Sequence, residues 1–161
     1  MADESRPVHV LMVCLGNICR SPMAEAVFRA RVKEAGLDDR IVVSSAGTGR
    51  WHVGESPHPG TLREIGKHGL DLVGKTAQHV SDYDLPSVDY VVAMDTDNQR
   101  DLGGDALLLL DFADPPSGIR SVPDPYYGGG FGRVYELVDA GSRGLLAHIA
   151  SDLGIDQRSR E

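Results

Sequence analysis

The sequence predicts an α/β protein, with three α/β/α layers built on a parallel sheet of four strands. Short apolar stretches of strand length alternate with stretches of helical period along the chain. Such alternation is typical of parallel sheets covered by helices on both faces. The chain has 161 residues, of which 41% are hydrophobic, and shows no repeat or linker. One domain is therefore expected over residues 1–161, with an ordered core at about 8–154 and short tails.

The first half of the chain contains two expected strands and two expected helices. The stretches VHVLMVC (8–14) and IVVSSAG (41–47) are short, apolar and rich in β-branched residues, as buried strands are. Between them, a Ser-Pro pair favours a helix start, and the apolar spacing predicts a helix over 21–36 that ends at a glycine. TLREIGKHG (61–69) predicts a second, short helix.

The second half continues the alternation. VDYVVAM (88–94) is expected to form the third strand and ALLLLD (106–111) the fourth, with a helix at about 96–104 between them. Apolar residues then keep a helical period over 131–153, which predicts the last helix although two glycines interrupt it. In parallel sheets ligands collect at the carboxyl ends of the strands. The segment after the first strand is therefore the expected site.

Composition excludes several classes of partner. A net charge of −8 argues against nucleic acid or an anionic membrane as the main partner. The chain contains no apolar stretch of membrane-spanning length and no signal-peptide pattern, so a cytoplasmic protein is expected. Two cysteines do not form a disulfide scaffold, and the six histidines show no metal-ligand spacing. No cofactor or metal is expected, and the expected state is a monomer or weak homodimer.

The stretch VCLGNICRSP (13–22) places both cysteines in one glycine-containing turn after the first expected strand. Five residues separate Cys14 from Arg20, and a loop of that length entering a helix can direct successive backbone N–H groups into one anion site. Gly16 and Asn17 tolerate a positive φ, and Arg20 offers a planar fork to two phosphate oxygens. The predicted phosphate-binding loop comprises Leu15, Gly16, Asn17, Ile18, Cys19 and Ser21.

Cys14 is the candidate nucleophile of this loop. The inward N–H groups, the helix start and Arg20 all favour a thiolate, and Ser21 can either cap the helix or donate a hydrogen bond to the sulfur. The same groups would stabilise a transferring phosphoryl group without a metal. For an isolated Cys-x5-Arg, a buried cysteine and a surface arginine are the simpler interpretation. Here the preceding strand, the Gly-Asn pair and the helix start favour catalysis.

A second candidate segment, SVPDPYYGGGFG, lies in the loop from about Asp111 to Gly130. Loops of that length in compact domains are usually functional or disordered. Asp124 can protonate a leaving oxygen and then activate water, and Tyr126 and Tyr127 can wall an aromatic slot. A plain Asp-Pro turn with packed tyrosines explains the same residues equally well.

With both segments in hand, the chain resembles the low-molecular-weight protein tyrosine phosphatases. VCLGNICRSPMAEAVF and DPYYG resemble the two main motifs of the family and occur in its order, and SSAGTGRWHVGE and VVAMDTDN resemble further family segments. The resemblance covers nearly everything from His9 to the last helix. It implies a flavodoxin- or Rossmann-like fold with a phosphate loop at the end of the first strand. It also implies hydrolysis of phosphotyrosine in protein substrates through a cysteinyl-phosphate intermediate.

The resemblance also implies a role for each matched residue. Cys14 is the implied nucleophile, Arg20 the phosphate clamp and Asp124 the general acid and base. Cys19 is an implied redox partner of the nucleophile, with apolar packing beneath the loop as the alternative. The implied loop supports are Asn17, Ser21 and Ser45, and the implied cleft walls are Leu15, Trp51, Tyr126 and Tyr127.

Three further positions carry expectations. Asp95 matches a family aspartate near the site and fits a helix cap equally well. Arg50, beside Trp51 at the expected cleft rim, would favour acidic flanks around a phosphotyrosine. The family often has a His-x-Ala-Arg segment where this sequence reads Gly74 to Ala77. Gly74 is therefore expected to replace a histidine that braces the phosphate loop, which would leave Asn17 less rigidly held.

Other functions fit the sequence less well. Arsenate reductases share the loop but need two further cysteines, and this chain has none beyond Cys19. Phosphoarginine phosphatases of the family tend to carry Thr where Ile18 stands, so phosphoarginine ranks second to phosphotyrosine. A phosphotyrosine-binding module without turnover has no use for Asp124. A thiol-redox role of the two cysteines alone does not need Arg20.

Overall fold

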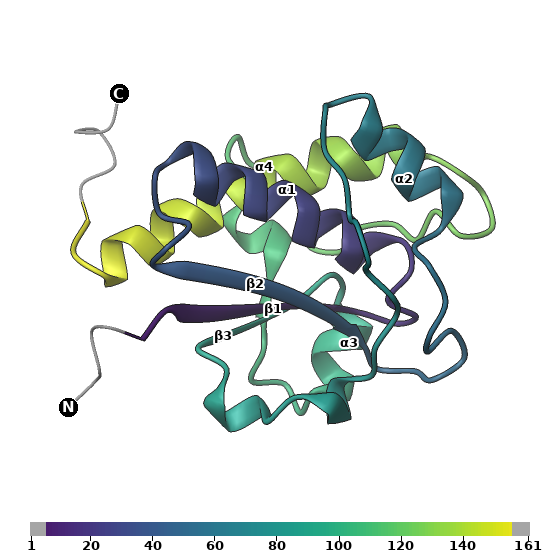
Figure 1. The fold of residues 1–161 in the computed structure, drawn as a ribbon, viewed down its shortest axis with the longest axis horizontal. Coiled ribbons are helices and arrows are strands. Elements are labelled where there is room, and N and C mark those ends of the chain that lie inside the picture. The colour runs from purple at the N-terminus through teal and green to yellow at the C-terminus, as the bar shows by residue number, and fades with distance from the viewer. Residues whose placement is uncertain (1–5, 156–161) are drawn as a thin grey trace.

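A parallel sheet of four strands forms the centre of the computed structural model, which describes residues 6–155 (Figure 1). The strands are β1 (Val8–Cys14), β2 (Ile41–Gly47), β3 (Tyr90–Ala93) and β4 (Leu107–Leu108), in the spatial order β2-β1-β3-β4. Each neighbouring pair of strands is parallel. β1 is hydrogen-bonded on both sides, to β2 and to β3. The expected tails fall mostly on residues 1–5 and 156–161, which lie outside the described residues.

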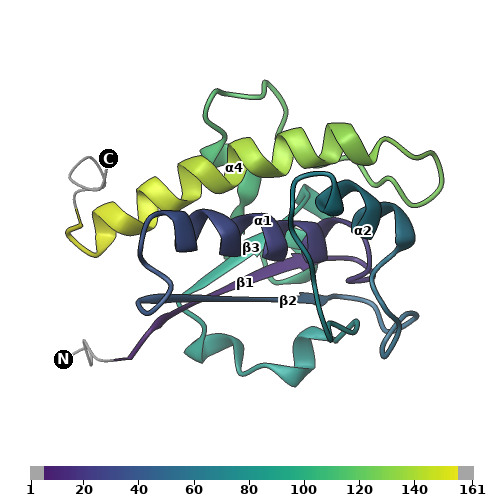
Figure 2. The ribbon, with the colours of Figure 1, turned by 45° about the horizontal axis from the view of Figure 1, so that its top comes forward.

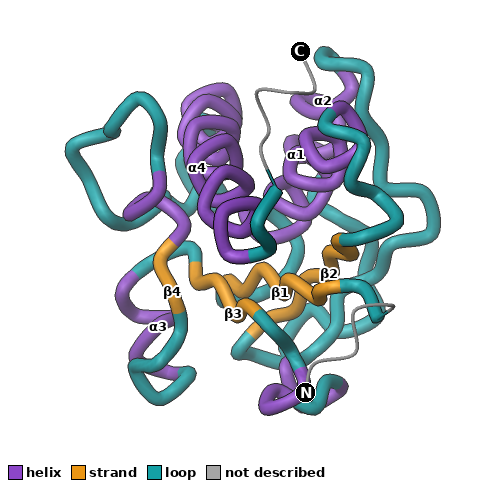
Figure 3. Tube along the Cα trace, turned by 90° about the vertical axis from the view of Figure 1, so that its left-hand side faces the viewer, coloured by secondary structure: helices purple, strands orange, loops and turns teal. Residues whose placement is uncertain are grey.

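Three helices cover one face of this sheet. α1 (Arg20–Glu34), α2 (Pro59–Gly66) and α4 (Phe131–Asp152) lie together on that side, as Figures 1 and 3 show from two directions. Figure 2 shows α4 running along α1. Every residue from 20 to 28 is buried, because α1 packs against the sheet and against both α4 and α2. Within residues 6–155, no helix is both long enough and apolar enough to cross a membrane.

The opposite face is covered mostly by irregular chain. It carries α3 (Thr96–Asp101) and a segment with two single 3-10 turns, Val80–Asp82 and Leu85–Ser87 (Figure 3). The sequence predicts helices on both faces, and here the cover is one short helix and turns, because Pro86 and its polar neighbours do not sustain a longer helix. The sheet residues buried on this face are Leu11, Val13, Ala46, Ala93 and Leu108.

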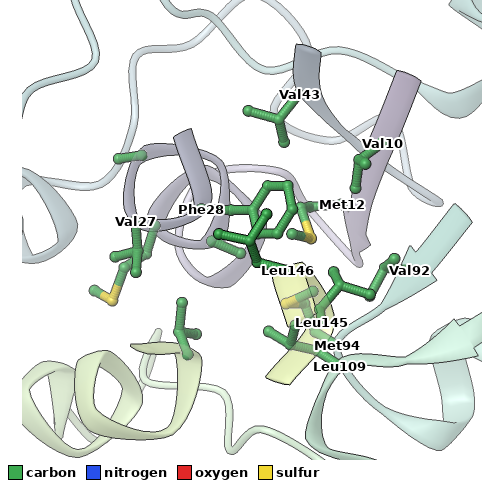
Figure 4. Close-up of a cluster of buried hydrophobic side chains, with 14 of the residues drawn as sticks. Val10, Met12, Val27, Phe28, Val43, Val92, Met94, Leu109, Leu145 and Leu146 are labelled. Carbon is green, nitrogen blue, oxygen red and sulfur yellow. The ribbon is translucent and has the colours of Figure 1, made fainter. Parts of the chain in front are cut away.

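The main core lies between the sheet and the three helices. Figure 4 shows Phe28 of α1 meeting Met12 of β1 and the leucines of α4, and these side chains are fully or almost fully buried. Removal of a phenyl ring such as Phe28 from a core of this kind costs about 3–5 kcal/mol. The core therefore fixes α1 against β1, and both ends of the loop that joins them are held in place.

The fourth strand is much shorter than the sequence predicts. Residues 106–111 were expected to be a strand, but only Leu107–Leu108 pair with β3, and a 3-10 turn (Leu109–Phe112) follows. The turn packs into α4 at Gly141 and Gly144, where an added Cβ would lie 2.6 Å from Leu109 Cγ and 1.5 Å from the Phe112 carbonyl oxygen, respectively. The two glycines of the last helix are thus explained by close backbone approach.

The remaining boundaries shift by a few residues. The first helix begins one residue earlier than expected, the second lies at 59–66 rather than 61–69, and the third ends at Asp101. The predicted α/β class and the parallel sheet are confirmed. Because β1 and β3 are parallel neighbours, their carboxyl ends bring Cys14 and Asp95 to the same edge of the sheet.

Candidate active site

The loop of residues 15–19 joins β1 to α1 and closes over the sulfur of Cys14. The Asn17 backbone N–H donates to Cys14 Sγ at 3.3 Å. Asn17 has a φ of 57°, the only positive φ of a non-glycine residue among residues 6–155. The end of β2 lies against this loop, since a Cβ at Gly47 would come within 2.6 Å of the Leu15 carbonyl oxygen. The positive φ of Asn17 reverses the chain direction within the loop, so that successive backbone N–H groups can face one anion.

The ladder between β1 and β2 continues past the sheet into the loop. Thr48 N–H donates to the Cys14 carbonyl at 3.0 Å, and Gly49 N–H donates to the Leu15 carbonyl at 2.8 Å. These bonds fix the start of the loop to the segment that follows β2.

The side chain of Asn17 is the internal support of the loop. Its Nδ2 donates to Ser21 Oγ at 2.8 Å and to Ser45 Oγ at 2.9 Å, and its Oδ1 accepts from Gln78 N–H at 2.9 Å. The side chains of Asn17, Ser21 and Ser45 are thereby paired, as buried polar groups generally are. The expected support from Asn17 and Ser45 agrees with this geometry.

Ser21 does not cap the helix. α1 has Cys19 at its N-cap position and no side-chain cap, whereas Ser21 Oγ lies 3.0 Å from Cys14 Sγ. Both hydrogens of the Asn17 amide group are donated to serines, so the hydroxyl hydrogen of Ser21 is available to the sulfur. Of the two expected uses of Ser21, the structure shows the bond to sulfur.

Arg20 is a buried cation aimed at the carboxyl edge of the sheet. Its Nη1 donates to Asp95 Oδ2 at 2.6 Å and to the Val122 carbonyl at 3.0 Å, and its Nη2 lies 3.7 Å from Asp124 Oδ2. Burial works against the charge, but Cys14, Asp95 and Asp124 outweigh it and raise the pKa of Arg20. Arg20 therefore stays charged and oriented towards any anion in the loop.

Asp95 serves both purposes that the sequence left open. Its Oδ1 accepts the Asn98 N–H at 2.7 Å and caps α3, while its Oδ2 holds Arg20. Val122 joins this arrangement because its own N–H donates to the Met94 carbonyl at 2.8 Å. The long loop that carries Asp124 is thus tied to the end of β3.

A cavity of about 390 Å³ opens above the loop. Cys14 and Arg20 line it from one side, and Asp124 lines it from the other. The remaining lining residues are Leu15, Gly16, Ile18, Cys19, Trp51, His52, Tyr126 and Tyr127. Asn17, Ser21, Ser45 and Asp95 do not line the cavity, since they support it from behind.

Aromatic side chains form the mouth of the cavity. Tyr126 lies between His52 and His58, with ring centroids 5.6 and 5.8 Å away, and contacts Tyr127 edge-on at 4.7 Å. Trp51 is 72% exposed and Tyr127 93% exposed, so both rings project into solvent at the rim. The mouth therefore offers flat apolar faces of the kind on which an aromatic ring stacks.

His52 is a lining residue that the sequence analysis missed. Its ring edge lies over the loop, since a Cβ at Gly16 would be 2.9 Å from His52 Cδ2. His52 Nδ1 lies 3.1 Å from Glu55 Oε2. The segment WHVGE contains both residues, but only its fold onto the loop shows that the histidine faces the cavity.

Arg50 does not line the cavity, contrary to expectation. Its side chain points away along the surface and donates to Ser81 Oγ at 3.1 Å. The turn that begins at Trp51 brings Trp51 and His52 to the cavity, and Arg50 precedes this turn.

Gly74 does not occupy the position of a loop brace either. It is exposed, has a φ of 75°, and an added Cβ would meet nothing within 4 Å. The next residue, Lys75, points inward instead: its side chain is 10% exposed, and its Nζ donates to the Ser45 carbonyl at 2.9 Å. The structure therefore places Lys75 rather than Gly74 behind the loop, and Gly74 supplies the left-handed turn that sends Lys75 inward.

Cys19 is buried next to Ile18, Ala77 and Phe131. Burial, together with the negative charges of Asp124 and Cys14 and against the opposing charge of Arg20, raises the pKa of the Cys19 thiol to about 12. Cys19 is therefore a thiol at neutral pH.

Within residues 6–155, no three His, Cys, Asp or Glu side chains are grouped so as to hold a metal ion.

Fold and site together define a class of protein: an α/β phosphoryl-transfer enzyme with a cysteine in an anion-binding loop. Residues 9–155 match the profile of the family described as Low molecular weight phosphotyrosine protein phosphatase. The chain belongs to this family.

Several relatives are similar over nearly their whole length. The chain is 43% identical to low molecular weight protein-tyrosine-phosphatase YfkJ of Bacillus subtilis over 90% of this chain and 97% of the relative. It is 45% identical to the low molecular weight phosphotyrosine protein phosphatase of Schizosaccharomyces pombe over 91% and 99%, respectively. The crystal structure of YfkJ superposes with a TM-score of 0.86 at 42% identity, covering 91% of this chain and 97% of that one. A solved Drosophila arginine phosphatase, 31% identical, gives a TM-score of 0.81 over 89% and 98%.

Proposed function

We propose that this protein hydrolyses phosphotyrosine in protein substrates through a cysteinyl-phosphate intermediate. The observation that carries the proposal is that Cys14, Arg20 and Asp124 line one cavity, with the sulfur at the closed side of an anion-binding loop and aromatic rings at the mouth. The family membership supports the same reaction.

In the first step, the Cys14 thiolate attacks phosphorus while the bond from phosphorus to the phenolic oxygen breaks. The loop N–H groups and the Arg20 guanidinium bind the non-bridging oxygens, where negative charge develops. Asp124, at the cavity wall near Arg20, gives its proton to the departing phenolate oxygen. The products of this step are a free tyrosine side chain and phosphate bound covalently to Cys14.

In the second step, water attacks the phosphorus of the cysteinyl phosphate. The Asp124 carboxylate takes a proton from the water as the phosphorus–sulfur bond breaks, and Cys14 returns as a thiolate. Ser21 Oγ, 3.0 Å from Cys14 Sγ, stabilises this thiolate by donating to it. Inorganic phosphate then leaves, and Asp124 has its proton back.

The shape of the cavity supports an aryl phosphate as substrate. Ile18 and Leu15 give it apolar walls, and Trp51 and Tyr126 add flat aromatic faces at the mouth, on which a phenyl ring could stack. Phosphoserine is too short to place its phosphate in the loop while its backbone stays outside the rim. Phosphoarginine is the second candidate, since a solved arginine phosphatase has the same fold.

We also infer regulation by oxidation. Hydrogen peroxide would convert the Cys14 thiolate to a sulfenic acid, and the Cys19 thiol would then displace water to form a disulfide between the two sulfurs. The supporting observation is that the two residues border one cavity within a single loop. Reduction by a thiol would restore Cys14.

Composition supports further inferences about the domain number, location and oligomeric state of the enzyme. We infer a single domain over 1–161 in the cytoplasm, as a monomer or weak homodimer. The net charge of −8 supports the view that neither nucleic acid nor a membrane is a partner.

Phosphate release from matched phosphotyrosine, phosphoserine and phosphoarginine substrates tests the proposal. With EDTA present, the natural protein should release phosphate from phosphotyrosine, Cys14→Ser should abolish release and Asp124→Ala should slow it. Faster release from phosphoarginine would favour the second candidate. Binding of phosphotyrosine without turnover under reducing conditions would favour a binding module and refute the enzyme.

A further inference from the structure

Behind the phosphate loop, a lysine and a glutamate pair with little exposure to solvent. The side chain of Lys75 is 10% exposed and that of Glu25 7% exposed, and Lys75 Nζ lies 3.4 Å from Glu25 Oε1. Lysine and glutamate are rarely buried to this degree unless they are paired. Neither residue lines the cavity, so the reaction steps above do not use them.

This pair is joined to the nucleophile by a continuous set of hydrogen bonds. Ser45 Oγ donates to Glu25 Oε1 at 2.6 Å. Asn17 Nδ2 donates to both Ser45 Oγ and Ser21 Oγ, and Ser21 Oγ lies against Cys14 Sγ. The side chains of Ser45, Asn17 and Ser21 are called here the serine–asparagine network.

Asn17 sets the direction of the donors in this network, because its Oδ1 accepts from Gln78 N–H and both hydrogens of its Nδ2 go to the serines. A carboxylate accepts and does not donate, so the single hydroxyl hydrogen of Ser45 must go to Glu25. The Ser45 oxygen then accepts from Asn17, whose second amide hydrogen goes to Ser21. The hydroxyl hydrogen of Ser21 then has two acceptors, the Cys14 sulfur at 3.0 Å and the Ala46 carbonyl at 3.5 Å, and the sulfur is the nearer one.

We propose that Lys75 is a positioning residue for Cys14, because its ammonium balances the buried charge of Glu25 and holds the Ser45 carbonyl, so that the serine–asparagine network is held in place behind the sulfur. A buried carboxylate is stabilised by a cation beside it. Lys75 supplies that cation and also holds the Ser45 carbonyl at 2.9 Å. The inference rests on the proposed role of Cys14 as nucleophile.

The other charged groups around the pair contribute less. Arg29 on α1 donates to Glu25 Oε2 at 2.5 Å, but its side chain is half exposed and screened by water. Tyr83, beyond the first 3-10 turn, is coupled to Glu25, and this coupling helps burial to raise the pKa of the phenol. Burial lowers the pKa of Lys75, Arg29 lowers it further, and Glu25 and Cys14 oppose the fall.

Loss of the ammonium weakens the support of the sulfur in two ways. The Glu25 carboxylate loses its buried partner, and its negative charge then disfavours a thiolate at Cys14. The Ser45 carbonyl also loses its donor, so Ser45 is held less firmly against Asn17. Cys14 should therefore become reactive at a higher pH.

Two substitutions separate charge from shape. Lys75→Met keeps the length and the apolar stem but loses the charge, whereas Lys75→Arg keeps the charge and changes the shape. Lys67→Met is the matched control. Lys67 also pairs with a glutamate, Glu64, at 3.5 Å, but the side chain of Lys67 is 69% exposed.

The first measurement is the rate of alkylation of Cys14 by iodoacetamide against pH, followed at that residue by mass spectrometry. It needs no turnover. The midpoint of the profile should move up by about 0.5 to 1 pH unit in Lys75→Met, in keeping with the loss of a nearby charge. Lys75→Arg and Lys67→Met should coincide with the natural protein.

The second measurement is steady-state hydrolysis of p-nitrophenyl phosphate. Lys75→Met should lose about tenfold in kcat with a smaller change in KM, because one charge-assisted support of the nucleophile is gone. Lys75→Arg should recover most of the loss. The double variant with Glu25→Gln and Lys75→Met should have a higher kcat than Lys75→Met alone, since the uncharged amide oxygen still accepts from Ser45.

The outcomes are distinct. An unchanged alkylation profile in Lys75→Met, or a profile changed more by Lys75→Arg than by Lys75→Met, would overturn the positioning role and leave only packing. If Lys75→Met does not fold, the double variant, which buries no charge, is compared with the natural protein in its place, and a profile shifted upward by a full unit there would overturn the role. A natural protein without turnover but with the expected alkylation shifts would refute the proposed function and leave this inference standing.

Discussion

Arg20 and Asp95 hold each other across the carboxyl edge of the sheet, with Arg20 Nη1 and Asp95 Oδ2 2.6 Å apart. One residue follows β1 and the other follows β3, the strand beside it. Since the second oxygen of Asp95 caps α3, the orientation of the guanidinium depends on a helix start that lies outside the cavity. The phosphate clamp is therefore preorganised before any substrate binds.

Substitution of Asp95 should separate these two tasks. Asp95→Ala removes both bonds, so the free energy of unfolding should fall by about 1 kcal/mol and kcat/KM by about tenfold. Asp95→Asn has only one oxygen, and Asn is a good cap, so stability should stay near that of the natural protein while kcat/KM still falls. Urea unfolding and p-nitrophenyl phosphate kinetics measure the two effects. Equal kinetics in Asp95→Asn and the natural protein would show that Arg20 does not need the charge.

His52 should contribute to substrate binding rather than to the chemical step. Its ring edge covers Gly16 and faces Tyr126 in the cavity wall. His52→Ala removes part of this wall, so KM for phosphotyrosine should rise about fivefold, which corresponds to about 1 kcal/mol, with little change in kcat. Arg50→Ala is the neighbouring control outside the cavity and should leave both constants unchanged. A fall in kcat with unchanged KM would instead place His52 in the chemical step.

The protection of Cys14 from oxidation should become faster as pH rises. Only the thiolate of Cys19 attacks a sulfenic acid, and with a pKa of about 12 its thiolate fraction grows about tenfold per unit of pH across the neutral range. After a peroxide pulse, activity recovered by dithiothreitol should therefore increase from pH 6 to pH 8.

Cys19→Ala provides the contrast for this experiment. Without a second thiol, Cys14 should proceed to the sulfinic acid, and dithiothreitol should restore little activity at any pH. Full recovery in Cys19→Ala would refute the disulfide.

Gly144 should tolerate no side chain. A Cβ there would lie 1.5 Å from the Phe112 carbonyl oxygen, which belongs to backbone and cannot turn aside. Gly144→Ala should lower the free energy of unfolding by about 2 kcal/mol, against the gain in helix propensity. Gly132→Ala in the same helix meets only Glu64 Oε1 at 3.6 Å and should be neutral or slightly stabilising. Chemical denaturation of both variants checks the difference.

The local part of the site could be predicted from the sequence because its chemistry lies within one turn. Cys14, Asn17 and Arg20 are close together along the chain, and a strand followed by a Gly-Asn pair and a helix start leaves few arrangements. The expected parallel sheet has the same origin, since the apolar stretches of the strands are consecutive and well separated.

Contacts between distant segments could not be predicted in this way. The inward turn of Lys75, the Val122 carbonyl on Arg20 and the position of His52 over the loop depend on how three surface segments cross the carboxyl edge of the sheet. The short β4 has a similar cause. Its leucines are apolar enough for a strand, but the chain turns after Leu108 and packs closely against the glycines of α4.

The extension of the ladder beyond β2 has a consequence for motion. The amides of Thr48 and Gly49 are bonded to the carbonyls of Cys14 and Leu15, so the loop cannot swing away from β2 unless these bonds open. In native-state hydrogen exchange, both amides should be among the slowest of any outside the regular elements, exchanging in the same cooperative event as the interior of β1. Adjustment to different substrates would then fall to the exposed side chains of Trp51 and Tyr127, while the place where phosphorus is transferred remains fixed.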